Sequence, residues 1–474
     1  MIKSIKKLIA NLDYEILNGE MRDFDIGKVC YDSKKVAEND LFICLKGARF
    51  DSHSLLSEII KDGAKVIVVN KDNEYIKDFS FDKDVIVLGV KNERIALSII
   101  SSNYFDNPKD KLKIIGITGT KGKTTTAFMI RSVLMHNGYK VGMIGTIGIF
   151  FENEHILTDN TTPESFILHE YFRKMLDRGI QYVVMEVSSQ SLKYHRVYGI
   201  DFYFAIWTNI KPEHIGENEH DDYDDYINSK LKIFNQCENA LINSFTDDYD
   251  RIVSYIKDKT NCKLYEKTEN KKFELKIPGD YNQENASLAY RFGEIIGIDD
   301  EIIKKALSDT VVPGRIETVY SDSDFKVIVD YSYEDNGAKR FLKTIREANP
   351  EGRIVAVFGC GGNRSKDRRY GMGKVSGELA DFVVLTADNS RYEKTIDIIR
   401  DIESTLTNYK KLGDLDSGYV IYEDRREAIE FAIKNRKPHD IICVMGKGHE
   451  PLMEMNGEKI HFLDKEVILD IINR

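Results

Sequence analysis

The sequence predicts an α/β protein of three domains, and three features of the chain carry this prediction. Its 474 residues are too many for one hydrophobic core and correspond to roughly three domains of about 150 residues each. Continuous apolar runs, typical of buried parallel strands, alternate with helical stretches. A glycine-rich turn at residues 116–122 joins one of these strands to a helix. We therefore expect a smaller N-terminal α/β domain, a central parallel sheet of the phosphate-loop mononucleotide-binding type and a Rossmann-like C-terminal sheet.

The N-terminal domain is expected to cover residues 1–108. Short strands are predicted at D-L-F-I-C-L-K-G (40–47) and K-V-I-V-V (65–69), in alternation with helices. The sequence Asp-Asn-Pro at 106–108 favours a turn, so we place the first domain boundary there.

The central domain is expected to cover residues 109–313. Its first strand ends at Thr118, and a helix follows from Thr124 to about His136. Two more runs are apolar on both faces and predict buried strands: Y-V-V-M-E-V (182–187) and F-A-I-W-T-N-I (204–210).

The C-terminal domain is expected to cover residues 314–474, after a break at V-V-P-G-R (311–315). Apolar runs alternate here with helical stretches, which predicts a second open parallel sheet. The runs are K-V-I-V-D-Y (326–331), R-I-V-A-V-F-G (353–359), F-V-V-L-T (382–386) and I-I-C-V-M-G (441–446).

The charge and the cysteines exclude several classes of protein. The net charge is −10 with acids and bases interspersed, so no basic face is offered to nucleic acid or to an anionic membrane. The six cysteines form no C-x-x-C pair and indicate reduced core thiols. No window approaches the roughly 18 apolar residues of a membrane span, and the N-terminus does not resemble a signal peptide. We expect a cytoplasmic monomer without nucleic-acid or membrane partners.

The turn I-I-G-I-T-G-T-K-G-K-T-T-T (114–126) predicts a nucleotide site. A glycine-rich bend before a helix aims backbone N–H groups at one point, which suits a phosphate. Lys123 would reach the outer phosphates, and the Thr124 hydroxyl would ligate magnesium. Ile117 stands where the strict pattern has glycine, so a shorter variant is implied; a tight turn without a ligand is the alternative. The predicted nucleotide contacts here are Gly119, Thr120, Lys121, Gly122, Lys123, Thr124 and Thr125.

Other polar residues are predicted to gather at the same edge of the central sheet. Open parallel sheets place their chemistry at the carboxyl ends of the strands, which here brings Glu186 and the segment 209–214 close to Lys123. Magnesium bound to a triphosphate accepts oxygen ligands such as Thr124 and Glu186. The group therefore favours metal-assisted phosphoryl transfer. His214 by itself would more often be a structural histidine.

Motifs spread along nearly the whole chain resemble those of the Mur ligase family of bacterial cell-wall synthesis. Beside the phosphate loop these are T-T-P-E (161–164), M-E-V-S-S (185–189), H-R-V (195–197) and W-T-N-I-K-P-E-H (207–214). A second set resembles the MurE type in particular: G-D-Y-N-Q-E-N-A (279–286), P-G-R-I-E (313–317), V-D-Y (329–331), G-C-G-G-N-R (359–364), D-N-S-R (388–391) and G-K-G-H-E (446–450).

The resemblance implies an ATP- and Mg²⁺-dependent ligase of peptidoglycan precursor synthesis, and so a role in cell shape and division. MurE-type enzymes join a diamino acid, usually meso-diaminopimelate or lysine, to UDP-N-acetylmuramoyl-L-alanyl-D-glutamate. They transfer the γ-phosphoryl group of ATP to the terminal carboxylate, and the amine then attacks the acyl phosphate. This route is chemically sensible because a carboxylate is a poor electrophile until one oxygen becomes a phosphate leaving group.

The resemblance also assigns roles to single residues. Lys123 would act on the phosphates, and the metal positions are Thr124, Glu186, His214 and Lys230, the last as a carbamylated lysine. The positions around the nucleotide are Asn282, Asn285, Arg315 and Asp330. Ser33 matches a uridine-nucleotide contact, and the muramoyl-dipeptide contacts are Thr161, Thr162, Ser188 and Arg196.

The diamino acid would be bound by residues that follow the strands of the C-terminal sheet. The matching positions are Arg364, Asn389, Arg391, Gly446 and Glu450. The two guanidiniums can clamp the distal carboxylate of diaminopimelate, and Glu450 can receive the distal ammonium. Lysine lacks that carboxylate, so meso-diaminopimelate or a close analogue such as meso-lanthionine is expected. A dinucleotide fold is a weak alternative for G-C-G-G, since Arg364 replaces the third glycine of that motif.

Four residues depart from the family pattern: Gln190, Tyr194, Tyr333 and Ser390. Ser390 replaces a proline and frees the backbone between Asn389 and Arg391, which would suit a diamino acid of different length. Two alternatives stay open: a divergent paralogue that joins another amine, such as lysine, or another carboxylate, and a non-catalytic nucleotide-binding protein. A scaffold protein would not need the intact Lys123, Glu186 and Lys230.

Overall fold

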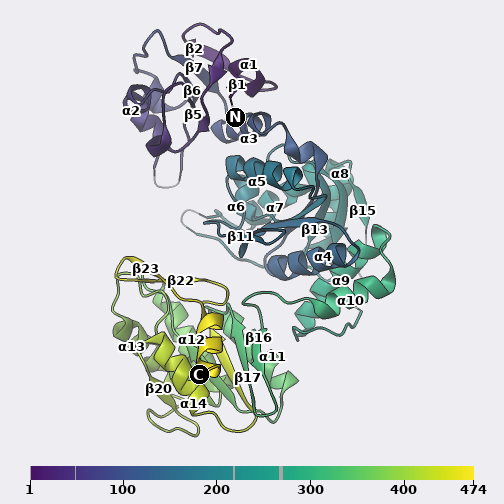
Figure 1. Cartoon of the computed structure of the whole chain (residues 1–474), viewed down its shortest axis with the longest axis vertical. Coiled ribbons are helices and arrows are strands. Elements are labelled where there is room, and N and C mark those ends of the chain that lie inside the picture. The colour runs from purple at the N-terminus through teal and green to yellow at the C-terminus, as the bar shows by residue number, and fades with distance from the viewer. Residues whose placement is uncertain (1, 48–49, 217–218, 266–270) are drawn as a thin grey trace. The chain divides into compact units, whose positions relative to one another are not determined.

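The computed structural model describes residues 2–47, 50–216, 219–265 and 271–474 (Figure 1). It forms two compact units. Unit 1 contains Met1–Lys272 with Glu284–Leu307, and unit 2 contains Phe273–Gln283 with Ser308–Arg474. Unit 1 holds two large sheets and unit 2 a third, which confirms the α/β architecture. The predicted domain boundaries at 108 and 313 stay predictions.

The N-terminal sheet of unit 1 has five strands in the order β2-β7-β6-β5-β4. These are β2 (Glu15–Asn18), β7 (Ile86–Val90), β6 (Val66–Asn70), β5 (Leu41–Ile43) and β4 (Val29–Cys30). They are parallel except for β2, which runs antiparallel to β7. Helix α3 (Glu93–Tyr104) covers one face, and the Asn92 side chain caps it by accepting from two backbone amides. A short pair, β1 (Lys3–Ser4) with β3 (Asp25–Ile26), and the helices α1 (Ile5–Leu8) and α2 (Leu56–Lys61) complete this part.

The central sheet of unit 1 has eight strands in the order β11-β10-β9-β12-β8-β13-β14-β15. Their bounds are β8 (Lys113–Thr118), β9 (Val141–Gly145), β10 (Gly148–Phe151), β11 (Glu154–Ile156), β12 (Tyr182–Glu186), β13 (Phe202–Trp207), β14 (Cys237–Ile242) and β15 (Lys263–Tyr265). The six strands from β9 to β15 are parallel, as predicted. The sheet is nevertheless mixed, because β10 and β11 form antiparallel hairpins at one edge. Only two residues join β9 to β10, too few for the crossover that parallel strands require.

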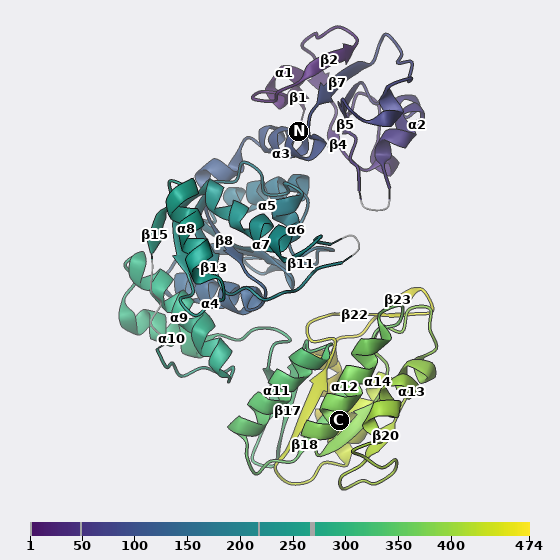
Figure 2. The ribbon, with the colours of Figure 1, turned by 180° about the vertical axis from the view of Figure 1, so that it is seen from behind.

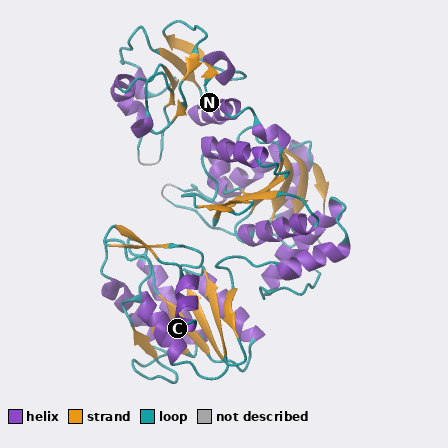
Figure 3. Ribbon diagram, in the orientation of Figure 1, coloured by secondary structure: helices purple, strands orange, loops and turns teal. Residues whose placement is uncertain are grey.

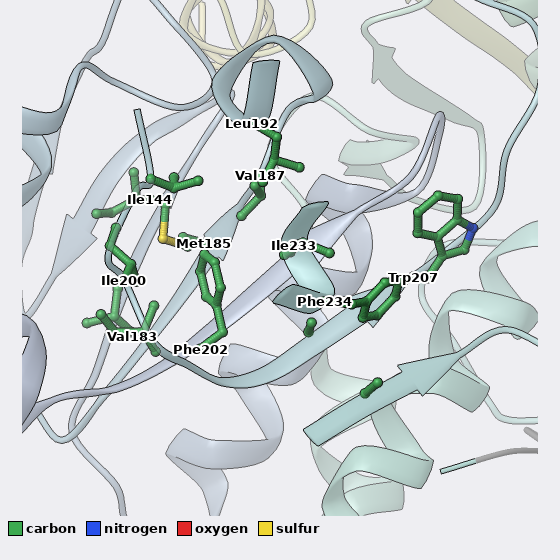
Figure 4. Packing of buried hydrophobic residues seen from close by; sticks show 14 of the residues in the cluster. Ile144, Val183, Met185, Val187, Leu192, Ile200, Phe202, Trp207, Ile233 and Phe234 are labelled. Carbon is green, nitrogen blue, oxygen red and sulfur yellow. The ribbon is translucent and has the colours of Figure 1, made fainter. Parts of the chain in front are cut away.

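Alternation along the central strands divides the apolar side chains between two layers of helices (Figure 3). Val183 and Met185 of β12 pack with Phe202 of β13 in the core beneath α5, α6 and α7, shown in Figure 4. Helix α4 packs against β8, β9 and β12. The helices are α4 (Lys123–His136), α5 (Ser165–Asp177), α6 (Ser189–Lys193), α7 (Tyr223–Leu231), α8 (Tyr249–Lys259), α9 (Asp280–Ile295) and α10 (Asp300–Asp309).

Unit 2 is built on a six-stranded sheet in the order β16-β17-β21-β18-β19-β20. Its strands are β16 (Glu317–Ser321), β17 (Phe325–Asp330), β18 (Ile354–Phe358), β19 (Phe382–Leu385), β20 (Tyr419–Ile421) and β21 (Asp440–Met445). All are parallel except β16, which is antiparallel to β17. The predicted strands are thus present, with one antiparallel edge added.

Helices cover both faces of the unit 2 sheet (Figure 2). Apolar residues of α14 and α15 share one core with β17, β18, β19 and β21. The helices are α11 (Asp335–Ala348), α12 (Lys366–Leu379), α13 (Thr395–Leu406), α14 (Arg425–Lys434) and α15 (Asp464–Ile472), and a hairpin is formed by β22 (Leu452–Met455) and β23 (Glu458–His461). Across the described parts of both units, no helix is long and apolar enough to cross a membrane.

Candidate active site

The glycine-rich turn connects β8 to α4, as predicted, and two of its glycines are required by geometry. Gly119 and Gly122 have φ values of 144° and 83°, in the region that favours glycine. A Cβ on Gly119 would lie 2.0 Å from the Thr208 hydroxyl oxygen, and one on Gly122 would lie 2.4 Å from Oδ1 of Asn285. The turn is therefore packed too closely for larger residues.

Residues that follow β13 hold the turn in place. The Thr208 hydroxyl donates to the Lys121 carbonyl at 2.7 Å, and Oδ1 of Asn209 accepts from the Lys121 amide at 2.9 Å. The Thr120 hydroxyl lies 3.0 Å from the Tyr226 hydroxyl of α7. Thr208 and Tyr226 were not predicted as site residues, because contacts between distant segments leave no signal in a single sequence.

Two lysine side chains meet at this turn. Nζ of Lys123 donates to the carbonyls of Gly119 and Thr120 at 2.9 and 3.0 Å. Nζ of Lys230, which is 1% exposed, donates to the same Gly119 carbonyl at 2.8 Å and lies 4.8 Å from the centre of the Tyr226 ring. Burial, reinforced by the charge of Lys123, lowers the pKa of Lys230 well below its usual value. Lys230 is thus a buried amine beside the phosphate loop.

Glu186 is held by hydroxyl and amide donors at the end of β12. Its carboxylate is buried and accepts from the Thr124 hydroxyl at 3.0 Å. Thr146, between β9 and β10, donates to it from its amide at 2.9 Å and from its hydroxyl at 3.2 Å. The structure thus brings Thr124 and Glu186 together, as predicted, and adds Thr146, which the sequence did not indicate.

The predicted dipeptide contacts in unit 1 continue from this cluster. The Thr161 hydroxyl lies 3.1 Å from the Thr146 hydroxyl, and the Thr162 hydroxyl donates to the Glu186 carbonyl at 2.9 Å. The Ser188 amide donates to the Thr162 hydroxyl at 3.1 Å, and Nη1 of Arg196 donates to the Thr162 carbonyl at 3.2 Å. These four predicted residues therefore form one connected group with Glu186.

His214 stands apart from this group. It is half exposed, and the contacts described for its ring are with Glu219, 3.4 Å from Nδ1, and with the Tyr226 ring. Within the described residues there is no set of three or more His, Cys, Asp or Glu side chains that could hold a metal ion. The oxygen donors that the structure gathers are those of Thr124 and Glu186, which suit a hard cation such as magnesium.

Other predicted contacts of unit 1 lie on neighbouring elements. Asn285 of α9 accepts from the Thr126 hydroxyl of α4 at 3.2 Å. Thr125 is buried in the first turn of α4. Ser33 begins a short 3₁₀ helix, Ser33–Lys35, in the N-terminal part.

Unit 2 contains three of the residues predicted around the nucleotide. Asp330 ends β17, is buried, and accepts from the amides of Ile316 and Ser332 at 2.8 and 2.9 Å. Burial raises its pKa, against the nearby charge of Arg315, whose guanidinium stacks over the Tyr331 ring at 4.5 Å. Nδ2 of Asn282 donates to the Pro278 carbonyl at 2.7 Å.

The predicted amine-binding residues of unit 2 follow the carboxyl ends of β18, β19 and β21. Glu450 accepts from the Tyr331 hydroxyl at 2.9 Å and from Nδ2 of Asn389 at 3.0 Å. Nε of Arg391 lies 3.6 Å from Glu454 of β22, and its Nη1 donates to the Gly362 carbonyl at 2.5 Å.

Gly361 and Gly446 lie among the predicted amine-binding residues. A Cβ on Gly361 would lie 3.6 Å from Nη1 of Arg391 and 3.8 Å from Cγ of Arg364, so the two arginines flank one glycine. Gly446 has φ 109°, and a Cβ there would lie 2.7 Å from the Asp388 carboxylate. The structure thus places the stem of Arg364 and the guanidinium of Arg391 near Gly361, and it adds Glu454 and Tyr331, which the sequence did not indicate; the clamp stays a prediction.

Comparison with known proteins identifies the family. The family model described as "Mur ligase middle domain" matches residues 117–272, and the model "Mur ligase, glutamate ligase domain" matches residues 314–448. The UDP-N-acetylmuramoyl-L-alanyl-D-glutamate--2,6-diaminopimelate ligase of Clostridium perfringens is 38% identical over 498 residues, covering 99% of both chains. The protein of the same name from Clostridium tetani is 39% identical over 500 residues, again covering 99% of each.

The chain belongs to the Mur ligase family. The fold agrees: a solved UDP-N-acetylmuramoyl-L-alanyl-D-glutamate--2,6-diaminopimelate ligase superposes with a TM-score of 0.67 at 22% identity, over 100% of this chain and 99% of the other. A Mycobacterium tuberculosis folylpolyglutamate synthase, solved with ADP and AMPPCP, gives a TM-score of 0.56 at 15% identity and covers 75% of this chain and 92% of its own.

The four departures from the Mur ligase pattern occupy different environments. The guanidinium of Arg94 lies over the Tyr194 ring, 5.2 Å from the ring centre. The ring of Tyr333 packs against that of Tyr331, with 5.2 Å between the ring centres. Ser390 is buried, and its hydroxyl lies 2.8 Å from that of Thr395. Gln190 lies in α6, where its carbonyl accepts the Tyr194 amide. Ser390 thus gains a hydrogen bond that a proline could not make.

Proposed function

We propose that this Mur ligase joins meso-diaminopimelate to UDP-N-acetylmuramoyl-L-alanyl-D-glutamate at the expense of ATP, in the synthesis of peptidoglycan precursors. One observation carries the proposal: relatives named for this reaction are 38–39% identical to the chain over 99% of its length. The group of Lys123, Thr124 and Glu186 supports it, because a nucleotide's phosphates need a cation and a metal ligand at one place.

The phosphoryl-transfer step is assigned to unit 1. Lys123 neutralises charge on the transferring γ-phosphoryl group, and the amides of the turn bind the remaining phosphate oxygens. A carboxylate oxygen of the dipeptide, held by the Thr162 and Ser188 group, attacks the γ-phosphorus, and ADP leaves. The product is an acyl phosphate, whose phosphate is a good leaving group.

Magnesium is assigned to the oxygen donors of Thr124 and Glu186, with Lys230 as a further ligand once it is carbamylated. When bound, the ion would offset the negative charge of the phosphates. His214 is kept as a proposed ligand, since the family pattern places it there. The contacts described for its ring are with Glu219 and Tyr226, so its role as a ligand stays a prediction.

The amide-forming step needs a bound and correctly oriented amine, which is assigned to unit 2. Arg364 and Arg391 bind the distal carboxylate of the diamino acid, while Glu450 accepts the distal ammonium. The reacting amine, once deprotonated, attacks the acyl carbon; the tetrahedral intermediate then expels phosphate and leaves an amide. The residues assigned to the nucleotide are Asn282, Asn285, Arg315 and Asp330. Those assigned to the UDP-muramoyl dipeptide are Ser33, Thr161 and Arg196.

The proposal also assigns one substrate to each predicted domain. Residues 1–108 would bind the uridine nucleotide, residues 109–313 ATP, and residues 314–474 the diamino acid. We propose that the protein works as a monomer.

A phosphate-release assay tests the proposed function. The wild type, given ATP, magnesium, the UDP-muramoyl dipeptide and meso-diaminopimelate, should release phosphate and form the tripeptide in equal amounts. The Lys123→Ala variant should lose about 10²-fold or more in rate, because it removes a charge from the transferring group. Near-normal turnover by a folded Lys123→Ala variant, or release of phosphate without tripeptide by the wild type, would contradict the ligase assignment.

A further inference from the structure

His220 is a buried histidine outside the residues proposed to bind the nucleotide, the metal or the substrates. Its side chain is 0% exposed, and both ring nitrogens have partners. Nε2 lies 2.9 Å from the hydroxyl of Ser189, which is the first residue of α6. Nδ1 lies 3.0 Å from the carboxylate of Asp225 in α7. The imidazole therefore joins two helices of unit 1 by hydrogen bonds.

The surroundings of Asp225 determine which way these bonds run. Nζ of Lys193 lies 2.6 Å from the same carboxylate, and this ion pair keeps Asp225 ionised. An ionised carboxylate only accepts, so the proton of the neutral imidazole lies on Nδ1 and Nε2 accepts from the Ser189 hydroxyl. The order Ser189, His220, Asp225 is that of a hydrolytic triad. However, Ser189 is only 4% exposed, so its hydroxyl is closed to a substrate.

Each partner of His220 adjoins a part of the proposed active site. Ser189 follows Ser188, whose amide is bound by Thr162 in the dipeptide group. Asp225 lies on α7, the helix that also carries Lys230 and whose Tyr226 contacts the phosphate-loop residue Thr120.

The backbone of His220 adds a third connection. Its amide donates to the His214 carbonyl at 3.0 Å, and its ring packs at 5.2 Å against Tyr226. The residue therefore touches the dipeptide side, the helix of Lys230 and the loop of His214 at once.

We infer that His220 is a positioning residue that holds the dipeptide-binding turn at Ser188 in register with α7 and the phosphate loop. The inference rests on the proposed function. The turn at Ser188 is assigned to the dipeptide, so a loose connection there would weaken dipeptide binding. It would also lower kcat, because the attacking carboxylate and the γ-phosphorus must be about 3–3.5 Å apart and aligned.

The test compares His220→Ala, His220→Gln and Ser189→Ala by steady-state kinetics and by calorimetry of dipeptide binding in EDTA. Loss of one buried hydrogen bond should raise the KM and the dissociation constant of the dipeptide about tenfold in His220→Ala and Ser189→Ala. The KM of ATP should change less than about threefold.

His220→Gln, which retains an amide donor and acceptor, should recover part of the loss. The double variant His220→Ala/Ser189→Ala should be no worse than His220→Ala, because the two residues act through one bond.

Ser229→Ala is the matched control. Ser229 also donates to Asp225, at 3.3 Å, but does not connect it to α6, so its loss should leave the dipeptide KM unchanged. Unchanged dipeptide affinity in a folded Ser189→Ala or His220→Ala variant, or additive effects in the double variant, would overturn the inference. If the wild type binds the dipeptide but makes no product, the proposed function fails, while the calorimetry still decides the role of His220.

Discussion

Lys230 shows how burial can prepare a residue for chemistry. A lysine that is 1% exposed cannot easily carry a charge, and the neighbouring Lys123 disfavours that charge further, so the pKa of Lys230 is lowered and the neutral amine is favoured. A neutral amine adds to carbon dioxide, forms an N–C bond and releases a proton. The carbamate proposed for Lys230 would be an anionic oxygen ligand, which would suit the magnesium ion proposed near Glu186.

We expect Lys230→Ala to lose nearly all activity and to recover part of it with added formate or acetate, which can occupy the vacated ligand position. The rate should fall at least about 10²-fold, as for loss of a ligand to transition-state charge. ¹³C NMR of the wild type under labelled carbon dioxide should show a carbamate signal that Lys230→Ala lacks. A folded Lys230→Ala variant with ordinary rates, or a wild type without the signal, would refute the carbamate.

His169 is a second buried ionisable residue, and its effect should be on stability. It lies in α5, and within the described residues neither ring nitrogen has a hydrogen-bond partner. Burial, helped by the charge of Lys109, lowers its pKa from 6.5 to about 3. The unfolded chain takes up a proton near pH 6.5 and the folded chain does not, so stability is full above that pH and falls as the pH drops towards 3.

This predicts that His169 alone costs about 1.4 kcal/mol of unfolding free energy per pH unit below its unfolded pKa, or about 2 kcal/mol by pH 5. Denaturant unfolding of the wild type and of His169→Leu at several pH values measures the effect. The free-energy difference between the two proteins should shift in favour of His169→Leu on acidification. A constant difference from pH 7 to pH 5 would show that His169 does not titrate in this way.

At the scale of elements, the turn between β8 and α4 depends on Gly119. Its positive φ and the 2.0 Å approach to the Thr208 hydroxyl oppose any side chain. We expect Gly119→Ala to lower the unfolding free energy by about 1–3 kcal/mol and to weaken ADP binding at least about tenfold, since the amides facing the phosphates must shift.

Gly138 provides the control for this prediction. It also has a positive φ, 84°, but a Cβ there meets nothing within 4 Å. Gly138→Ala should therefore cost only about 1–2 kcal/mol from backbone strain and leave ADP affinity unchanged. Calorimetry and denaturant unfolding measure both variants. Equal ADP affinity in the two would mean that the close packing at Gly119 does not shape the phosphate site.

The elements that the sequence predicted correctly are those with strong local patterns. The strand that ends at Thr118 and the helix that ends at His136 are present, because an apolar run, a glycine-rich turn and a helix-stopping glycine are all local signals. The hairpins β10–β11 and β22–β23 were not predicted: β11, β22 and β23 are short and partly exposed, whereas β10 is an apolar run that the sequence analysis did not assign. Thr146, Thr208 and His220 were missed for another reason: their roles depend on contacts between segments distant in the sequence.

At the scale of the whole molecule, the proposed substrates are divided between the two units. Residues assigned to the phosphates and to the dipeptide carboxylate lie in unit 1, and those assigned to the amine lie in unit 2, which also contains Asn282, Arg315 and Asp330, assigned to the nucleotide. Arg391 is not among the residues assigned to the nucleotide, so a substitution there should change the choice of amine and leave the affinity for ADP unchanged.

Arg391 offers the test of this separation and of the amine itself. A guanidinium left without a carboxylate is costly, so the wild type should prefer meso-diaminopimelate to lysine in kcat/KM by about 10²-fold or more. Arg391→Ala should reduce that preference to less than about tenfold while ADP affinity stays constant. Arg400→Ala, an exposed charge on α13 of the same unit, should change neither quantity. Rates with meso-diaminopimelate, meso-lanthionine, ornithine and lysine decide the matter: if the wild type uses lysine as efficiently as the dicarboxylic amines, Arg364 and Arg391 do not form a clamp for a second carboxylate.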